Sequence, residues 1–235
     1  PSAPPLALTS ASDSGLKGDG LTKIDTPSLR VSFVASQVSA GNVISVSSGG
    51  QVIGTKSLSA PEANAGVAQV TVSSLGADGM KSLTASIADR AGNISAASTA
   101  LQISLDRTPP NAPLLNLVAS SDTGISDDNI TSDATPQIVA VFNSAQISTG
   151  SVLSLQSAGG EVASVTLSST DIAAGKVTLT TSDLGLDGTK AITARLSDAA
   201  GNLSSGGSGV TVQLDRTAPT APVLTLNTVS DSGVK

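Results

Sequence analysis

Apolar residues along the chain fall into short runs that clusters of Gly, Pro, Asn, Asp and Ser separate. Leu29, Val31 and Phe33 occupy every second position of one run, and Leu83, Ala85 and Ile87 do so in another. A period of two places alternate side chains on one face of a β-strand. The pattern predicts strands over residues 6–10, 29–34, 43–47, 51–58, 67–73, 81–88 and 97–105.

The segments between these runs have the composition of turns. Gly49 and Gly50 predict a hairpin turn, and residues 12–27 predict a long loop rich in Asp and Gly. The second half of the chain repeats the strand pattern from Leu114 to Leu214. Residues 171–175 are the one segment where we expect a helical turn.

The pattern repeats after 109 residues without a gap: Asp13 aligns with Asp122 and Asp231, and Pro4 aligns with Pro113 and Pro222. This period exceeds the 20–50 residues of solenoid repeats and matches a whole β-sandwich domain. We therefore predict an all-β chain of two tandem immunoglobulin-like β-sandwich domains. They cover residues 1–108 and 109–217, a short proline-containing linker joins them, and residues 218–235 are the first strand and loop start of a third repeat.

The composition excludes several classes of function. There is no Cys and no His, so disulfides, thiolate metal sites and His-dependent catalytic triads are impossible. Trp and Tyr are also absent, which predicts aliphatic cores and removes the usual sugar-binding platforms. A net charge of −6 disfavours nucleic acid as a partner, and no apolar run is long enough to insert into a membrane. We expect a protein that is not an enzyme.

Several repeating motifs resemble those of one protein family. The stretches "DGMKSLTASIADRAGNISAAS" and "LDRTPPNAP", their second copies, and the loop "SDTGISDDNITSDATP" are similar to bacterial Ig-like domains of giant surface adhesins. Relatives often carry Tyr shortly after the DG turn, where this chain has Met80-Lys81 and Thr189-Lys190. The resemblance implies an extender region of a repeats-in-toxin or biofilm-associated adhesin at the bacterial cell surface. It also implies Ca²⁺ at domain junctions.

The acidic residues support a calcium hypothesis independently. There are 16 Asp but two Glu, and most of the Asp residues lie in repeating columns. In an antiparallel sandwich, the loop after the first strand, the turn before residue 81 and the end of the last strand share one pole. That pole faces the turn at residues 198–202 of the next domain. Because Ca²⁺ takes six to eight oxygen ligands, we predict metal ligands at Asp13, Asp19, Asp78, Asp106 and Asp198, and at the second-copy positions Asp122, Asp128, Asp187 and Asp215.

Two readings of these aspartates stay open at this point. Asp also favours turns because its side chain bonds to nearby backbone N–H groups, and this role suits Asp89 and Asp198 as well as a metal does. The expected function is a calcium-rigidified spacer: a monomeric rod whose partners are neighbouring repeats and which projects a distal ligand-binding region. The alternative is a repeat that itself binds a carbohydrate, ice or a host receptor.

Overall fold

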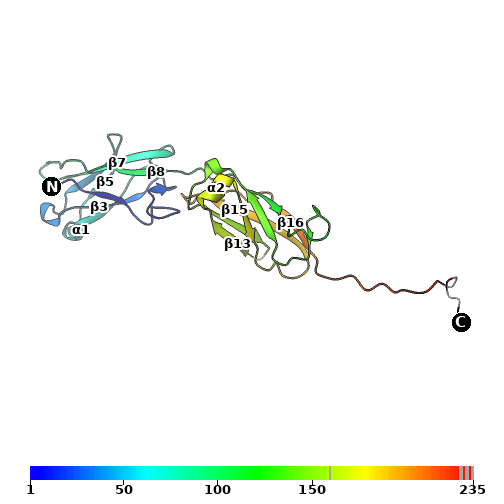
Figure 1. The fold of residues 1–235 in the computed structure, drawn as a ribbon. Coiled ribbons are helices and arrows are strands. Elements are labelled where there is room, and N and C mark those ends of the chain that lie inside the picture. Colours follow the sequence, from blue (N-terminus) through cyan, green and yellow to red (C-terminus); the bar gives the residue numbers. More distant parts are fainter. Residues whose placement is uncertain (159, 228–229, 231–232, 234–235) are drawn as a thin grey trace.

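The computed structural model describes residues 1–158, 160–227, 230 and 233. Two β-sandwich domains lie end to end, and the chain leaves the second as an extended tail (Figure 1). The strands of domain 1 are β1 (Leu6–Leu8), β2 (Leu21–Thr22), β3 (Ser28–Ser32), β4 (Val43–Ser48), β5 (Gln51–Ser57), β6 (Val67–Thr71), β7 (Gly79–Ala88) and β8 (Leu101–Leu105). Those of domain 2 are β9 (Leu114–Leu117), β10 (Ile130–Thr131), β11 (Gln137–Val141), β12 (Val152–Ser157), β13 (Gly160–Thr166), β14 (Lys176–Thr180), β15 (Gly188–Ser197) and β16 (Val210–Leu214).

Each domain consists of a three-stranded and a five-stranded sheet. Domain 1 has the orders β1-β3-β6 and β2-β8-β7-β4-β5, and domain 2 has β9-β11-β14 and β10-β16-β15-β12-β13. Neighbouring strands are antiparallel except β2 with β8 and β10 with β16, which are parallel. The predicted all-β fold of two immunoglobulin-like sandwiches is confirmed.

Alternating apolar positions fill the space between the two sheets. Leu83, Ala85 and Ile87 on β7 are buried, as the period of two predicts, and Leu29 and Val31 face them from β3. Domain 2 has a separate aliphatic core of the same kind around Leu153, Leu155 and other residues of β11, β12 and β15. Each domain therefore buries a core of its own, which is the condition for an independent folding unit.

Helical segments are short and lie at the sheet edges. The structure has α2 (Ser169–Ala174) where a helical turn was expected, and also α1 (Ala60–Ala65), which was not expected. A capping box of Ser59 and Glu62 starts α1, and η1 (Ala35–Gln37) and η2 (Ser144–Gln146) are single 3₁₀ turns. None of the helices in the described segments is long and apolar enough to span a membrane.

The last strand of domain 1 is shorter than predicted, because β8 begins at Leu101 rather than at residue 97. In the preceding segment, serines pair with β7 without forming a regular strand. The N–H groups of Ser95 and Ser98 donate to Ile87 O and Ala85 O, and their hydroxyls accept from Ile87 N and Ala85 N, each at 3.0 Å. Side-chain oxygens can satisfy the edge of a sheet in this way without a regular strand.

The predicted first strand of a third repeat is not formed in the described part of residues 218–235. Residues 218–227 have no assigned secondary structure, and Val223 and Leu224 are 88% and 92% exposed. The equivalent residues in domain 2, Leu114 and Leu115, belong to β9, which pairs with β11. A strand requires such a pairing partner. The rest of this prediction, at residues 228–229, 231–232 and 234–235, lies outside the described residues.

Candidate functional site: the domain junction

The two ends of each domain present different loops. At the end that we call the lower pole, the β1–β3 loop (residues 9–27), the β6–β7 turn (residues 72–78) and the end of β8 meet. The parallel pairing of β2 with β8 holds this loop in place, and the N–H of Asp106 donates to Thr22 O at 2.9 Å. The upper pole is the opposite end, with the turn at residues 89–93 in domain 1 and 198–202 in domain 2. The lower pole of domain 1 contacts the upper pole of domain 2.

Three successive backbone carbonyls of domain 2 accept hydrogen bonds from domain 1. Leu16 N donates to Ala199 O at 3.0 Å, Ser14 Oγ to Ala200 O at 2.7 Å, and Lys23 Nζ to Gly201 O at 2.5 Å. In the other direction, Asn202 Nδ2 donates to Asp106 O at 2.9 Å. A typical hydrogen bond contributes about 0.5–1.5 kcal/mol net. These contacts fix both the distance and the rotation between the domains.

A glycine allows this close approach. Gly15 has φ +61°, and a Cβ at this position would lie 2.0 Å from Ala199 O, which is well inside contact distance. On the other side, a Cβ on Gly201 would lie 3.1 Å from Gly15 Cα. Two glycines therefore face each other across the junction, and any side chain at Gly15 would push the domains apart.

Comparison of the two copies shows how much of this turn the neighbour covers. Ala200 is fully buried, and Asp198 and Asn202 are 5% and 6% exposed. The equivalent Ala91 and Asn93 are exposed at the upper pole of domain 1, which no domain contacts in the described structure. Docking accounts for this difference, since Asp89 and Asp198 each accept the same two hydrogen bonds from the asparagine of their turn.

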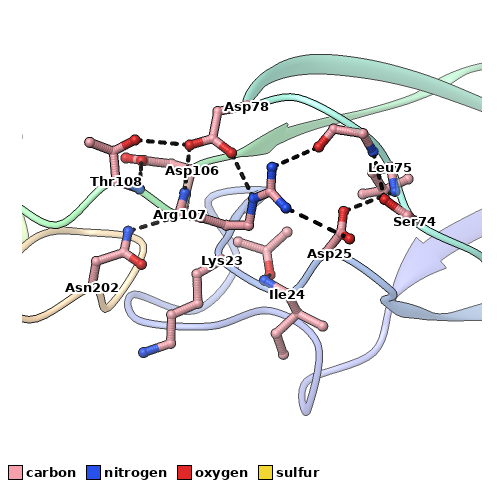
Figure 2. Close-up of polar contacts among 12 residues, drawn as sticks. Lys23, Ile24, Asp25, Ser74, Leu75, Asp78, Asp106, Arg107, Thr108 and Asn202 are labelled. Carbon is pink, nitrogen blue, oxygen red and sulfur yellow. Dashed lines mark hydrogen bonds and ion pairs between the residues drawn. The ribbon is translucent and has the colours of Figure 1, made fainter.

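An arginine clamps the chain where it leaves domain 1 (Figure 2). Arg107 donates to Asp78 through its Nε at 2.8 Å and its backbone N–H at 2.9 Å, and its Nη2 donates to Gly76 O at 2.8 Å. Asp25 pairs with the same guanidinium at 3.7 Å, and Thr108 Oγ1 donates to Asp78 at 3.0 Å. This network holds the first residues of the linker against the lower pole.

Domain 2 has the same clamp without the Asp25 contact, because Ala134 takes that position, and no domain is docked below it in the described structure. Arg216 Nε donates to Asp187 at 2.9 Å, its Nη2 donates to Gly185 O at 2.7 Å, and Thr217 Oγ1 donates to Asp187 at 2.9 Å. The clamp is therefore a property of each domain. It sets the direction of the outgoing chain before the next domain binds.

The clamp shifts the acidity of its members. Hydrogen bonds from the backbone N–H and then the guanidinium of Arg107 lower the pKa of Asp78 below its usual range. The guanidinium of Arg216, followed by its backbone N–H, lowers the pKa of Asp187. The hydrogen bond to Asp78 raises the pKa of Arg107 in turn. Both clamps are thus ionised at neutral pH.

The turn aspartates bind their own backbone. Asp198 accepts from Asn202 N at 2.8 Å and from Asn202 Nδ2 at 2.9 Å, so it holds the asparagine that reaches Asp106 O. Asp89 accepts the same pair of bonds from Asn93, and the side-chain amide bond lowers the pKa of Asp89. Asp106 and Asp198 line one junction cleft of about 360 Å³.

The structure only partly gathers the nine aspartates that the sequence suggests as calcium ligands. In the segments that it describes, no three acidic side chains are grouped closely enough to hold a metal ion. Asp78 and Asp187 bind arginine, and Asp19 and Asp128 accept from the backbone of Leu21 and Ile130. Asp106 and Asp215 likewise accept from the N–H groups of the threonines two residues later. The nine residues do not form a carboxylate cage, and calcium binding stays a prediction.

One aspartate position differs from the others. Asp13 Oδ2 accepts from Gly18 N and Asp122 Oδ2 from Asp127 N, both at 2.6 Å, but Oδ1 of each is buried and has no hydrogen-bond partner among the described residues. A buried carboxylate oxygen without a partner is costly. Of the nine candidates, Asp13 and Asp122 are therefore the two whose Oδ1 atom would be stabilised by a hydrogen-bond donor or a cation.

The sequence interpretation missed the three groups that make the junction: Gly15, the carbonyls of residues 199–201, and the arginine clamp. A signal for two of them was present, because Gly15 repeats as Gly124, and Arg107 and Asp78 repeat together as Arg216 and Asp187. Paired repetition of opposite charges indicates an ion pair more directly than it indicates a metal site.

Comparison with known proteins identifies the repeat. A sequence profile described as a bacterial Ig-like domain matches residues 1–107 and again residues 109–216. No curated protein matches the chain.

Three of the solved structures that match the chain do so at low identity and with TM-scores below 0.5. Fibronectin(III)-like modules of Clostridium thermocellum CbhA have 14% identity and a TM-score of 0.48, covering 94% of this chain and 100% of that one. A tetra-tandem repeat from the extending region of a large adhesion protein has 18% identity and a TM-score of 0.35, covering 91% and 50%. The D00-D0 domain of intimin has 15% identity and a TM-score of 0.27, covering 88% and 99%. Likenesses of this size carry no information on function.

Proposed function

The chain belongs to the bacterial Ig-like domain family over both of its domains, and from that premise we propose that it is a stiff spacer. In this proposal it is an extender segment of a large bacterial cell-surface adhesin and holds a distal ligand-binding region away from the cell. The partners of each domain are its neighbours in the same chain. The protein has no catalytic role and acts by its length and rigidity.

The observation that carries the proposal is the docked junction. Hydrogen bonds to the three carbonyls of residues 199–201 and the seating of Gly15 define one relative orientation. A flexible tether would instead be rich in Gly and Ser and make no such contacts. The linker itself contains Pro109, Pro110 and Pro113, whose fixed φ angles limit bending.

Calcium is an additional proposal. The partnerless oxygens of Asp13 and Asp122 support it, because a bound cation would satisfy them. The hydrogen bonds between the domains come from backbone groups and from the side chains of Ser14, Lys23 and Asn202 rather than from carboxylates, so we base the proposed stiffness on them and propose calcium separately. No feature of the described surface favours the alternative of a carbohydrate, ice or receptor site.

The spacer proposal is tested by the distribution of distances across the junction. Because the chain has no cysteine, spin labels can be placed on cysteines introduced at the exposed positions Gln69 of β6 and Thr178 of β14. We expect one narrow distance distribution by pulsed electron paramagnetic resonance, and a rod-like scattering profile. A distribution as broad as that of two domains on a flexible tether would contradict the proposal.

A further inference from the structure

Two domain ends have no domain against them in the described structure: the upper pole of domain 1 and the lower pole of domain 2. We propose that they are complementary halves of a second type of junction, so that a second copy of this chain docks head to tail below domain 2. The inference rests on the proposed spacer function and adds a rule for which domain follows which.

The lower pole of domain 2 is already arranged for docking. Gly124 corresponds to Gly15 and has φ +88°, and a Cβ at this position would meet nothing within 4 Å. Thr123 corresponds to Ser14: its hydroxyl accepts from Ser132 N at 2.8 Å, as Ser14 accepts from Lys23 N at 2.8 Å. The loop therefore has the docking conformation without a partner, and the space in front of the glycine is open.

The charges of this loop differ between the copies. In domain 1, residues 13–25 contain Lys17 and Lys23 beside three aspartates. In domain 2 the lysines are replaced by Ser126 and Ser132, and residues 122–134 contain four aspartates and no cation. The side chain of Asp127, which takes the place of Gly18, has no hydrogen bond or ion pair among the described residues. The loop at the lower pole of domain 2 is therefore more acidic than its equivalent in domain 1 and favours a cationic partner.

The upper poles differ in the opposite sense. Domain 2 has Ala199 in its turn, and Leu16 of domain 1 lies against Gly150, with Leu16 Cδ2 2.9 Å from where a Cβ would be. Domain 1 has Arg90 at the position of Ala199, and this side chain lies over Gly41, the equivalent of Gly150, at 3.5 Å from where its Cβ would be. Arg90 thus covers the surface at Gly41 that corresponds to the binding surface of Leu16 at Gly150.

The exposed guanidinium of Arg90 makes no hydrogen bond or ion pair in the part of the chain that the structure describes. It can leave Gly41 when Ile125, the equivalent of Leu16, arrives, and it can then pair with Asp127 or Asp128 of the acidic loop. In this pairing, the upper-pole turn with Ala199 binds the lysine-containing loop of domain 1. The upper-pole turn with Arg90 binds the acidic loop of domain 2. Opposite charges at a contact select one partner over another.

A chain of four domains tests this pairing. Joining Ala218 to Pro1 of a complete second copy keeps the period of 109, because Pro1, Pro110 and Pro219 are equivalent. Each domain has its own core, so all four can fold. Spin labels at residue 178 of the first copy and residue 69 of the second report the new junction. The same two positions within one copy report the junction already described. All samples contain EDTA, which removes bound divalent cations.

We expect a narrow distance distribution at the new junction. It should become roughly twice as broad in each of three separate cases: with Arg90→Glu in the second copy, with Asp127→Lys and Asp128→Lys together in the first copy, and at high salt. Combining the reversals on both sides restores the narrow distribution. The junction within one copy is unaffected and serves as the control. A broad distribution at the new junction alone, or one that ignores charge reversal, would overturn the inference. A broad distribution within one copy would instead overturn the spacer function.

Discussion

Gly15 and Gly124 are the same position of the repeat in two surroundings. Both have positive φ, which an L-residue adopts at a cost, and both follow a buried serine that lies three residues earlier. Only Gly15 faces a neighbouring domain. The pair therefore separates the conformational role of a glycine from its role in close approach.

We predict that Gly15→Ala and Gly124→Ala each destabilise their domain by about 1–2 kcal/mol, because both place a Cβ at positive φ. Only Gly15→Ala also undocks the domains, since its Cβ would overlap Ala199 O. Urea unfolding measures the first effect, and residual dipolar couplings of both domains measure the second. Equal domain alignment in the two variants would show that the contact at Gly15 is not required for docking.

At the scale of the element, the strands follow from alternation and the caps follow from local sequence. β12 shows this alternation: Leu153 and Leu155 are fully buried, whereas Val152 is 38% exposed. Side chains on the two faces of this strand should therefore contribute differently to the free energy of unfolding, although all three residues are aliphatic.

Leu155→Ala is expected to lower the free energy of unfolding of domain 2 by about 2–5 kcal/mol, through lost burial and the cavity that remains. Val152→Ala on the same strand is the matched control, with an expected change of roughly 0.5 kcal/mol or less. Chemical denaturation followed by circular dichroism distinguishes them. Similar losses in both variants would contradict the assignment of the buried face.

The arginine clamp gives a prediction in pH. Because Asp187 has a lowered pKa when folded, its contribution is complete above the unfolded value of about 3.9 and is lost as pH falls through the lower folded value. We therefore expect the amide of Arg216 to be protected from hydrogen exchange at pH 5–7 and to lose protection in acid. Amide exchange by NMR measures this. Asp187→Asn should remove the pH dependence, and a loss of protection in acid that persists in that variant would contradict the clamp.

These elements also show how far the sequence alone reaches. Period-two alternation is enough to predict the strands and cores, because a strand that is buried on one face has an apolar residue at every second position. The helix α1 was missed although Ser59 and Glu62 have the spacing of a capping box, since the helix is too short for a periodic pattern. The junction could be located at one pole but not resolved into contacts. Hydrogen bonds to carbonyls and the gap in front of Gly15 depend on a neighbour that is distant in sequence.

At the scale of the whole molecule, rigidity can come from direct contact or from bound ions. We predict that Ca²⁺ binds weakly, because among the described residues only Asp13 and Asp122 have a buried carboxylate oxygen without a partner. Chelation should leave the distance distribution across the junction narrow, because hydrogen bonds join the domains directly. Calorimetric titration counts the calcium sites, and the spin-label measurement with EDTA tests whether the junction stays rigid without calcium. A junction that becomes flexible on chelation would show that calcium is required for rigidity.

The two poles of each domain are unlike surfaces, and this has a consequence for assembly. A contact between unlike surfaces is heterologous, so it cannot close into a symmetric pair as a self-complementary surface does. Each unit that is added through the same type of junction instead repeats the same rise and the same rotation about the long axis. Domains that are joined by this contact form a helical arrangement with a fixed hand and pitch, and the length of the protein increases by a constant amount with each such junction.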